Sequence, residues 1–163
     1  ADILEHSMKN ELPQRQAVRL AKQKAFVVGK KFSGEFILGA DTIVSCGRRE
    51  LPKGDSEHQV RASLNLLSGR RHKVFGGIGL MLPSGRLISR LSVTVVQFKR
   101  LTNDEISDYI DSGEWQGKAG SYAIQGFAQS FIKRINGSFS NVVGLCLYEA
   151  MSLLKGSGYL GGK

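Results

Sequence analysis

The chain has 163 residues, 41% of them hydrophobic, which is the length and apolar content of one compact globular domain. Its formal net charge of +9 at pH 7 indicates an anionic partner, but the basic residues are scattered in pairs, so a dedicated nucleic-acid module is not expected. No apolar stretch is long enough for a membrane span, and two distant cysteines give neither a disulfide framework nor a zinc site, so we expect a reducing cytoplasmic location without membrane contact.

The first expected element is an amphipathic helix over residues 12–28, with Gly29 as its stop. Lys24 lies four residues after Leu20 and therefore on the apolar face of this helix. Its side chain can point toward the body of the protein or the rim of a cleft, or it can extend along the edge of the core with its ammonium group in water.

Residues 36–44 form an apolar run that predicts a buried strand, with Asp41 near its centre. An unpaired charge in that setting is costly, so the carboxylate needs compensation. A bound cation, a partner lysine or a place at a strand end facing a cleft would each supply it. Each of these would make Asp41 a functional candidate.

The middle of the chain predicts a helix followed by a hairpin. Asp55 is the expected N-cap of a helix that ends at residues 68–69. Residues 72–82 and 86–98 then read as two antiparallel strands, joined by a tight turn at Pro83-Ser84-Gly85.

The last part of the chain contains a capping box at Thr102, which predicts the start of a helix. A strand over residues 127–135 and a final helix over residues 145–154 follow. We expect a single α/β domain over residues 1–155 with a long mixed sheet flanked by helices, because strands and helices are interleaved without strict alternation. The glycine-rich residues 156–163 are expected to form a flexible tail.

Common nucleotide-binding and hydrolase motifs are missing from the sequence. There is no phosphate-binding P-loop, and the glycine cluster at residues 76–79 lacks the spacing of a dinucleotide fingerprint. A sparse set of charged and polar residues remains, in segments expected at strand ends or in loops. Its carboxylates can hold Mg²⁺ and its lysines can neutralise phosphate oxygens, although separate surface charges are the alternative interpretation. The set consists of Glu5, Lys24, Asp41, Lys53, Lys118 and Gln125.

Four stretches of the sequence resemble, in order, the successive motifs of the Maf family of nucleoside triphosphate pyrophosphatases. They are Gly39-Ala40-Asp41-Thr42-Ile43-Val44, residues 67–69 with 72–74, residues 118–126, and residues 135–138 with 141–145. Residues 19–25 are similar to the first helix motif of the family. The Ser-x-Ser-Pro-Arg-Arg segment that opens the family pattern has no match, so we expect residues 1–5 to correspond to the part that follows it.

This resemblance implies a cytoplasmic, commonly homodimeric enzyme, with a link of the family to septum formation. It implies a nucleotide cleft between two lobes beside a long mixed sheet. The expected reaction cleaves a nucleoside triphosphate between its α and β phosphates, giving a monophosphate and pyrophosphate, with Mg²⁺ or Mn²⁺ as cofactor.

The resemblance also assigns roles to individual residues. Asp41 matches the proton acceptor and, with Glu5, an expected metal ligand. The expected phosphate ligands are Lys24, Lys53 and Lys118. Thr42 and Gln125 match positions tied to base selection and resemble the branch that acts on dTTP and UTP. Two alternatives stay open: a pyrophosphatase for 7-methyl-GTP or another purine nucleotide, and a non-catalytic basic module that binds nucleic acid or a division protein.

Overall fold

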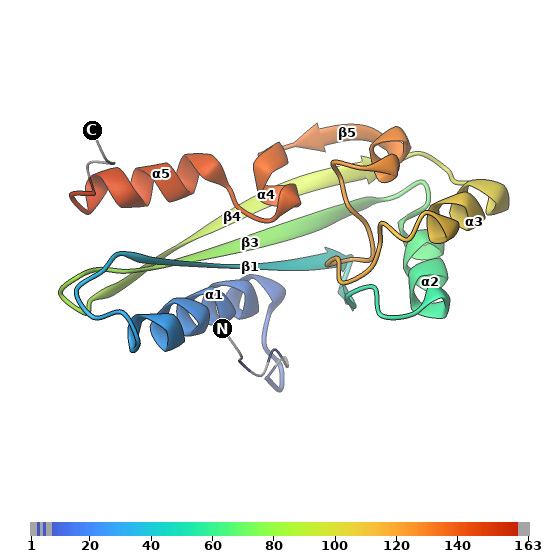
Figure 1. Cartoon of the computed structure of the whole chain (residues 1–163). Coiled ribbons are helices and arrows are strands. Elements are labelled where there is room, and N and C mark those ends of the chain that lie inside the picture. The colour runs from blue at the N-terminus through green and yellow to red at the C-terminus, as the bar shows by residue number, and fades with distance from the viewer. Residues whose placement is uncertain (1–2, 4, 6–7, 160–163) are drawn as a thin grey trace.

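A computed structural model of the chain describes residues 3, 5 and 8–159. These residues form one twisted sheet with helices on both faces (Figure 1). The strands are β1 (Ile37–Cys46), β2 (Arg49–Leu51), β3 (Arg71–Met81), β4 (Leu87–Phe98) and β5 (Ile132–Asn136). The helices are α1 (Pro13–Gly29), α2 (Glu57–Leu67), α3 (Asn103–Asp111), α4 (Phe139–Val143), α5 (Leu147–Gly156) and a short 3₁₀ helix, η1 (Phe127–Phe131).

The strand order in the sheet is β2-β1-β3-β4-β5, and every pairing between these strands is antiparallel. The α/β class and the flanking helices are therefore confirmed, whereas the expectation of a mixed sheet was wrong for the described residues. Short turns explain the antiparallel pairs β1–β2 and β3–β4, because a parallel pair would need a long crossover. The pairs β1–β3 and β4–β5 are joined by long helical connections, and their direction is set by the tertiary structure. Gly47 and Gly85 adopt positive φ angles in the tight turns after β1 and β3.

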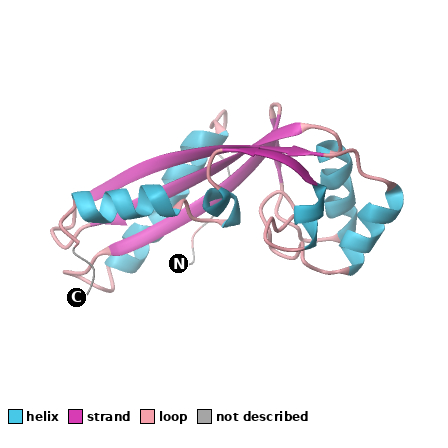
Figure 2. Ribbon diagram, turned by 90° about the horizontal axis from the view of Figure 1, so that it is seen from above, coloured by secondary structure: helices cyan, strands magenta, loops and turns pink. Residues whose placement is uncertain are grey.

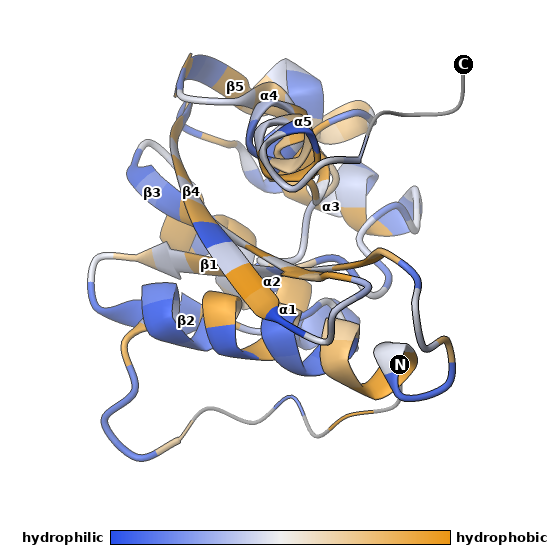
Figure 3. Ribbon diagram, turned by 90° about the vertical axis from the view of Figure 1, so that its left-hand side faces the viewer, coloured by the Kyte–Doolittle hydropathy of each residue, from blue (hydrophilic) through white to orange (hydrophobic). Residues whose placement is uncertain are grey.

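Helix α1 lies along one face of β1 and β3, and α4 and α5 lie on the other face, as the view along the sheet shows (Figure 3). The contact with α1 is unusually close because glycines of the sheet face small residues of the helix. A Cβ on Gly77 would overlap the backbone of Ala17, and one on Gly79 would lie 2.8 Å from the Cα of Lys22. The glycine cluster of β3 therefore serves helix packing.

The main hydrophobic core lies at the end of the sheet where α2, α3 and the loops after α3 gather into a lobe, seen from above in Figure 2. Its largest fully buried side chains include Leu64, Phe98, Tyr109 and Phe131. A smaller cluster joins β3 to α5 at the other end of the sheet. A third cluster, of Ala17, Leu20, Ile43 and Phe75, packs α1 against β1 and β3.

Several boundaries differ from the sequence-based expectations. Helix α2 begins one residue later than expected, because Ser56 is the N-cap and accepts a hydrogen bond from the backbone of Gln59. The expected strand over residues 127–135 begins as η1, in which Ala128 and Phe131 are buried with a spacing of three. The capping box at Thr102 is confirmed.

The C-terminal part contains two helices where one was expected. Helix α4 ends at Gly144, which has a φ of 140° and lets the chain turn before α5. Of the expected tail, Gly156 is the last residue of α5, and residues 160–163 lie outside the described residues.

Candidate active site

One cavity of about 250 Å³ gathers the residues singled out in the sequence. It lies beside the middle of β1 and is closed by the loop after α3 and by the end of α4. Six of the seven predicted site residues line it, although they come from four separate segments of the chain. They are Lys24, Asp41, Thr42, Lys53, Lys118 and Gln125.

The buried carboxylate of Asp41 has a lysine partner. Asp41 is only 7% exposed, and the Nζ of Lys24 lies 2.5 Å from its Oδ1. The same Nζ lies 2.7 Å from an oxygen of Glu5, the seventh predicted residue, and Glu5 also forms an ion pair with Lys53. Lys24 therefore extends from α1 into the cleft, and the charge of Asp41 is balanced by a chain of alternating charges.

The surroundings of Asp41, Glu5 and Lys24 shift the pKa values of all three side chains. Burial raises the pKa of Asp41, and the hydrogen bond and charge of Lys24 offset only part of that rise. Hydrogen bonds from Lys24 and Lys53 hold the pKa of Glu5 at about 2. Burial acts to lower the pKa of Lys24, but its two carboxylate partners outweigh this and raise the pKa. A carboxylate with a raised pKa, paired with a charged lysine, is a suitable proton acceptor.

Lys53 and Lys118 are brought together by backbone pairing between distant segments. Lys53 forms an isolated antiparallel bridge with Ala119, and the backbone N–H of Gly54 donates to the carbonyl of Lys118 at 3.0 Å. The N–H of Gly117 in turn donates to the carbonyl of Gly54 at 2.9 Å. Two cationic side chains therefore stand on adjacent strands of backbone at one wall of the cavity.

Sequence reasoning missed the less polar wall of the cavity. Tyr122 and Ala123 line it from the same loop as Gln125, and Val142, Val143 and Gly144 line it from the end of α4. All five lie within stretches already singled out as motifs, residues 118–126 and 141–145. Their small or apolar character gave no sign of a binding role by itself.

The site can hold part of the coordination shell of a divalent cation. Oxygens of Asp41 and Glu5 converge on one ammonium group, so the two carboxylates stand close together. Within the described residues there is no group of three or more His, Cys, Asp or Glu side chains that could hold a metal. Two carboxylates fit Mg²⁺, which commonly takes one or two protein carboxylates and completes its shell with water and substrate phosphates.

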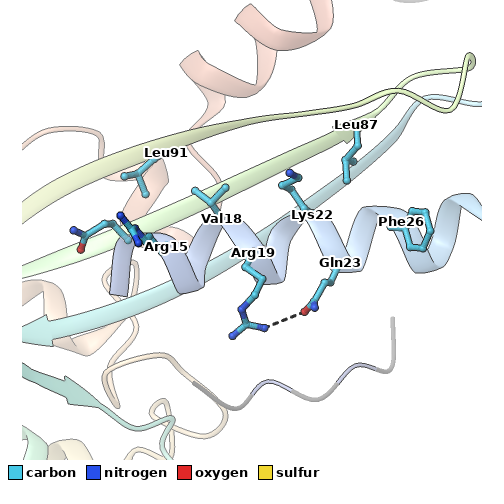
Figure 4. Close-up of a pocket in the computed structure, with 9 residues that line it drawn as sticks. Arg15, Val18, Arg19, Lys22, Gln23, Phe26, Leu87 and Leu91 are labelled. Atoms are coloured by element: carbon cyan, nitrogen blue, oxygen red, sulfur yellow. Dashed lines mark hydrogen bonds between the residues drawn. The ribbon is translucent and has the colours of Figure 1, made fainter. Parts of the chain in front are cut away.

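A second, larger hollow of about 610 Å³ lies between α1 and β4 (Figure 4). Val18, Phe26 and Leu91 give it an apolar lining, and Arg19 donates a hydrogen bond to Gln23 across its rim at 3.1 Å. Its lining residues include none of the predicted site residues and no carboxylate. The smaller cavity is therefore the better candidate for phosphate chemistry.

Comparisons with known proteins show the family of the chain. The family described as Maf-like protein matches residues 1–157. The dTTP/UTP pyrophosphatases of Paramagnetospirillum magneticum and Caulobacter vibrioides are 52% and 51% identical to this chain over 159 residues, covering 98% of it and 84% and 82% of their own lengths. The nucleoside triphosphate pyrophosphatase of Ehrlichia ruminantium is 50% identical over 153 residues, covering 94% of this chain and 80% of its own.

In the part of the chain that the structure describes, no helix combines the length and apolar character needed to cross a membrane. The family match extends over nearly the whole chain, and, apart from Lys53, the predicted residues that line the cavity lie in the stretches on which the resemblance rests. The chain therefore belongs to the Maf family.

Proposed function

We propose that this chain hydrolyses nucleoside triphosphates, with dTTP and UTP as preferred substrates, to a nucleoside monophosphate and pyrophosphate. The observation that carries the proposal is the single cavity in which a buried carboxylate faces three lysines. The names of the relatives, dTTP/UTP pyrophosphatase and nucleoside triphosphate pyrophosphatase, support the choice of reaction and substrate.

In the proposed reaction the triphosphate lies against Lys24, Lys53 and Lys118, whose charges offset those of the phosphate oxygens. Asp41 accepts a proton from a water molecule as the water oxygen forms a bond to the α-phosphorus. The bond between the α-phosphorus and the oxygen bridging to the β-phosphate breaks, and pyrophosphate leaves. Burial of Asp41 favours this role because it raises the basicity of the carboxylate.

We propose Mg²⁺ or Mn²⁺ as the cofactor, held by Glu5 and Asp41. When bound, the cation would offset the negative charge on the triphosphate. Lys24 stands between both carboxylates and keeps them paired and oriented.

The base is proposed to lie toward Thr42 and Gln125, which line the same cavity as Val143 and Gly144. A hydroxyl and a carboxamide can donate to and accept from the carbonyl and imide groups of a pyrimidine. A bulkier purine would have to fit between the same polar groups and the end of α4. This arrangement supports dTTP and UTP over purine nucleotides.

We further propose that the chain acts in the cytoplasm as a homodimer, with residues 1–155 as its single functional domain. Size-exclusion chromatography with light scattering measures the dimer directly. A mass equal to one chain at micromolar concentration would contradict it.

The reaction is tested by measuring pyrophosphate release from dTTP, UTP, dCTP, dGTP and 7-methyl-GTP in Mg²⁺ or Mn²⁺. Turnover of dTTP and UTP is expected, and Asp41→Asn should abolish it while the circular dichroism spectrum is unchanged. Asp108→Asn, on the exposed side of α3, is the matched control and should retain full turnover. Undiminished turnover in Asp41→Asn would refute the role of Asp41 as proton acceptor. Salt-sensitive RNA binding without any hydrolysis of the nucleotides would refute the proposed enzymatic activity.

A further inference from the structure

A buried pair of side chains joins the sheet to the wall of the candidate site. His72 lies in β3 and is 2% exposed, whereas Tyr122 lies in the loop that carries Lys118 and Gln125 and is 5% exposed. The Nε2 of His72 lies 2.8 Å from the hydroxyl oxygen of Tyr122. Tyr122 lines the cavity, but His72 does not.

Aromatic packing fixes the geometry of this pair. Both rings meet Phe98 edge to face, with ring centroids 5.1 Å from His72 and 5.0 Å from Tyr122. The His72 and Tyr122 rings themselves are 5.5 Å apart and nearly perpendicular. Neither ring can turn without disturbing the core around Phe98.

The contact is a hydrogen bond between neutral groups at pH 7. Burial lowers the pKa of His72 to about 4 and raises that of Tyr122 well above its ordinary value. The Nδ1 of His72 has no hydrogen-bond partner among the described residues. The Tyr122 hydroxyl is thus the polar group that this buried imidazole meets, and losing it would leave both ring nitrogens unpaired.

Two neighbouring residues anchor the same loop to other elements. The hydroxyl of Ser121 lies 3.2 Å from that of Ser63 in α2, and the N–H of Ala123 donates to the hydroxyl of Tyr109 in α3 at 3.1 Å. The anchor at Tyr122 is a side-chain hydrogen bond to β3, which pairs with the strand that carries Asp41 and Thr42. Backbone hydrogen bonds with Gly54, close to the end of β2, also hold the start of the loop at residues 117 and 118. The bond at Tyr122 therefore ties the part of the loop between Lys118 and Gln125 to the central strand of the sheet.

We propose that His72 is a positioning residue of the candidate site: together with the backbone bonds at Gly54, its bond to Tyr122 holds Lys118 and Gln125 at a fixed place relative to Asp41 and Thr42. The proposal rests on the proposed function and deepens it. It assigns to a histidine outside the cavity an effect on nucleotide binding and base selection. The proton transfer at Asp41 does not depend on His72, because Asp41 is held by Lys24.

The proposal predicts a rise in KM with little change in kcat. Tyr122→Phe and His72→Leu should each raise the KM for dTTP about 5- to 10-fold, the effect expected for loss of one buried hydrogen bond, while kcat changes less than about 2-fold. His72→Gln retains a side-chain amide that can reach the hydroxyl, and should restore KM to within about 3-fold of the wild type. The double variant Tyr122→Phe/His72→Leu should be no worse than either single variant.

A control separates positioning from loss of stability. Leu153→Ala weakens the small core under α5, at the other end of the sheet, and should lower stability without changing KM. If His72→Leu lowers stability and leaves KM unchanged, or if Leu153→Ala raises KM to the same extent, the proposal is wrong. Tyr122→Phe and His72→Gln are small changes that keep this comparison available if His72→Leu does not fold.

Binding measured by titration calorimetry with dTTP in the absence of divalent cation distinguishes this proposal from the proposed function. If the wild-type chain releases no pyrophosphate, the proposed hydrolysis is refuted. The Kd of dTTP still measures whether the loop that carries Lys118 and Gln125 is positioned for nucleotide binding. A Kd raised about 5- to 10-fold in His72→Leu supports positioning, and an unchanged Kd overturns it.

Discussion

The ion pair between Lys24 and Asp41 makes a sharp prediction for stability. Lys24→Met removes the ammonium group and keeps most of the apolar stem, so Asp41 loses the partner that lies 2.5 Å from its Oδ1. The Asp41 side chain is 5% exposed and cannot recover its hydration by a small movement. The variant therefore leaves a buried carboxylate without its main counter-charge.

The expected cost is about 2 to 3 kcal/mol at pH 7, because breaking a fully buried pair costs about 3 to 5 kcal/mol and this pair is partly accessible. Lys24 itself is 23% exposed, which reduces the value by screening. The cost should depend on pH. Losing Lys24 raises the pKa of Asp41 further, and a carboxyl with a raised folded-state pKa costs stability as pH rises from its unfolded-state pKa to that raised value. The difference from the wild type should therefore shrink toward pH 4.

Urea unfolding, followed by the fluorescence of the single tryptophan Trp115, measures this difference at pH 4.5 and pH 8. Lys22→Met removes the same charge from the same helix, and Lys22 has no ion pair among the described residues, so it should cost less than about 0.5 kcal/mol. Adding Asp41→Asn to Lys24→Met should recover most of the stability. A cost below about 0.5 kcal/mol in Lys24→Met, or no recovery in the double variant, would refute the reasoning.

Three further predictions concern packing, backbone conformation and pH. Gly77→Ala should cost about 3 kcal/mol in urea unfolding because the new methyl group overlaps the backbone of Ala17, whereas Gly156→Ala, which meets open space, should be neutral or slightly stabilising. Ser121 has a φ of 66°, so Ser121→Gly should be about 1 kcal/mol more stable than Ser121→Ala, which keeps the strain; equal stabilities would contradict this. The kcat/KM for dTTP should fall as pH decreases through the pKa of Asp41, which burial raises above 3.8; an acid limb at or below that value would contradict the assignment.

Much of the local structure could be predicted from the sequence. The capping box at Thr102, the hairpin around Gly85 and the amphipathic pattern of α1 each depend on residues a few positions apart. The candidate site residues could also be predicted from the sequence, because Asp41 is a carboxylate in an apolar run and the remaining positions lie in or near recognisable motifs. Their roles in catalysis and binding remain predictions.

Other features depend on contacts between distant segments. The mixed sheet was expected because helices and strands were interleaved, but the named pairings are antiparallel even where long helical segments connect the strands. In the sequence, the glycines of β3 resembled a dinucleotide-binding motif with the wrong spacing. In the structure, these glycines allow α1 to pack closely against the sheet. No local pattern indicated that His72 meets Tyr122, which lies 50 residues later in the chain.

The sequence by itself indicated most of the helices and strands and a set of residues whose chemistry suits phosphate binding, because caps, turns and apolar periodicity act over a few residues. Only the tertiary structure decided that Lys24 neutralises Asp41, that Lys53 stands beside Lys118, and that a buried histidine supports the wall of the cavity. The physical reason is that burial and pairing are properties of the packed chain. A carboxylate acquires a raised pKa and a partner lysine only when folding removes water from around both.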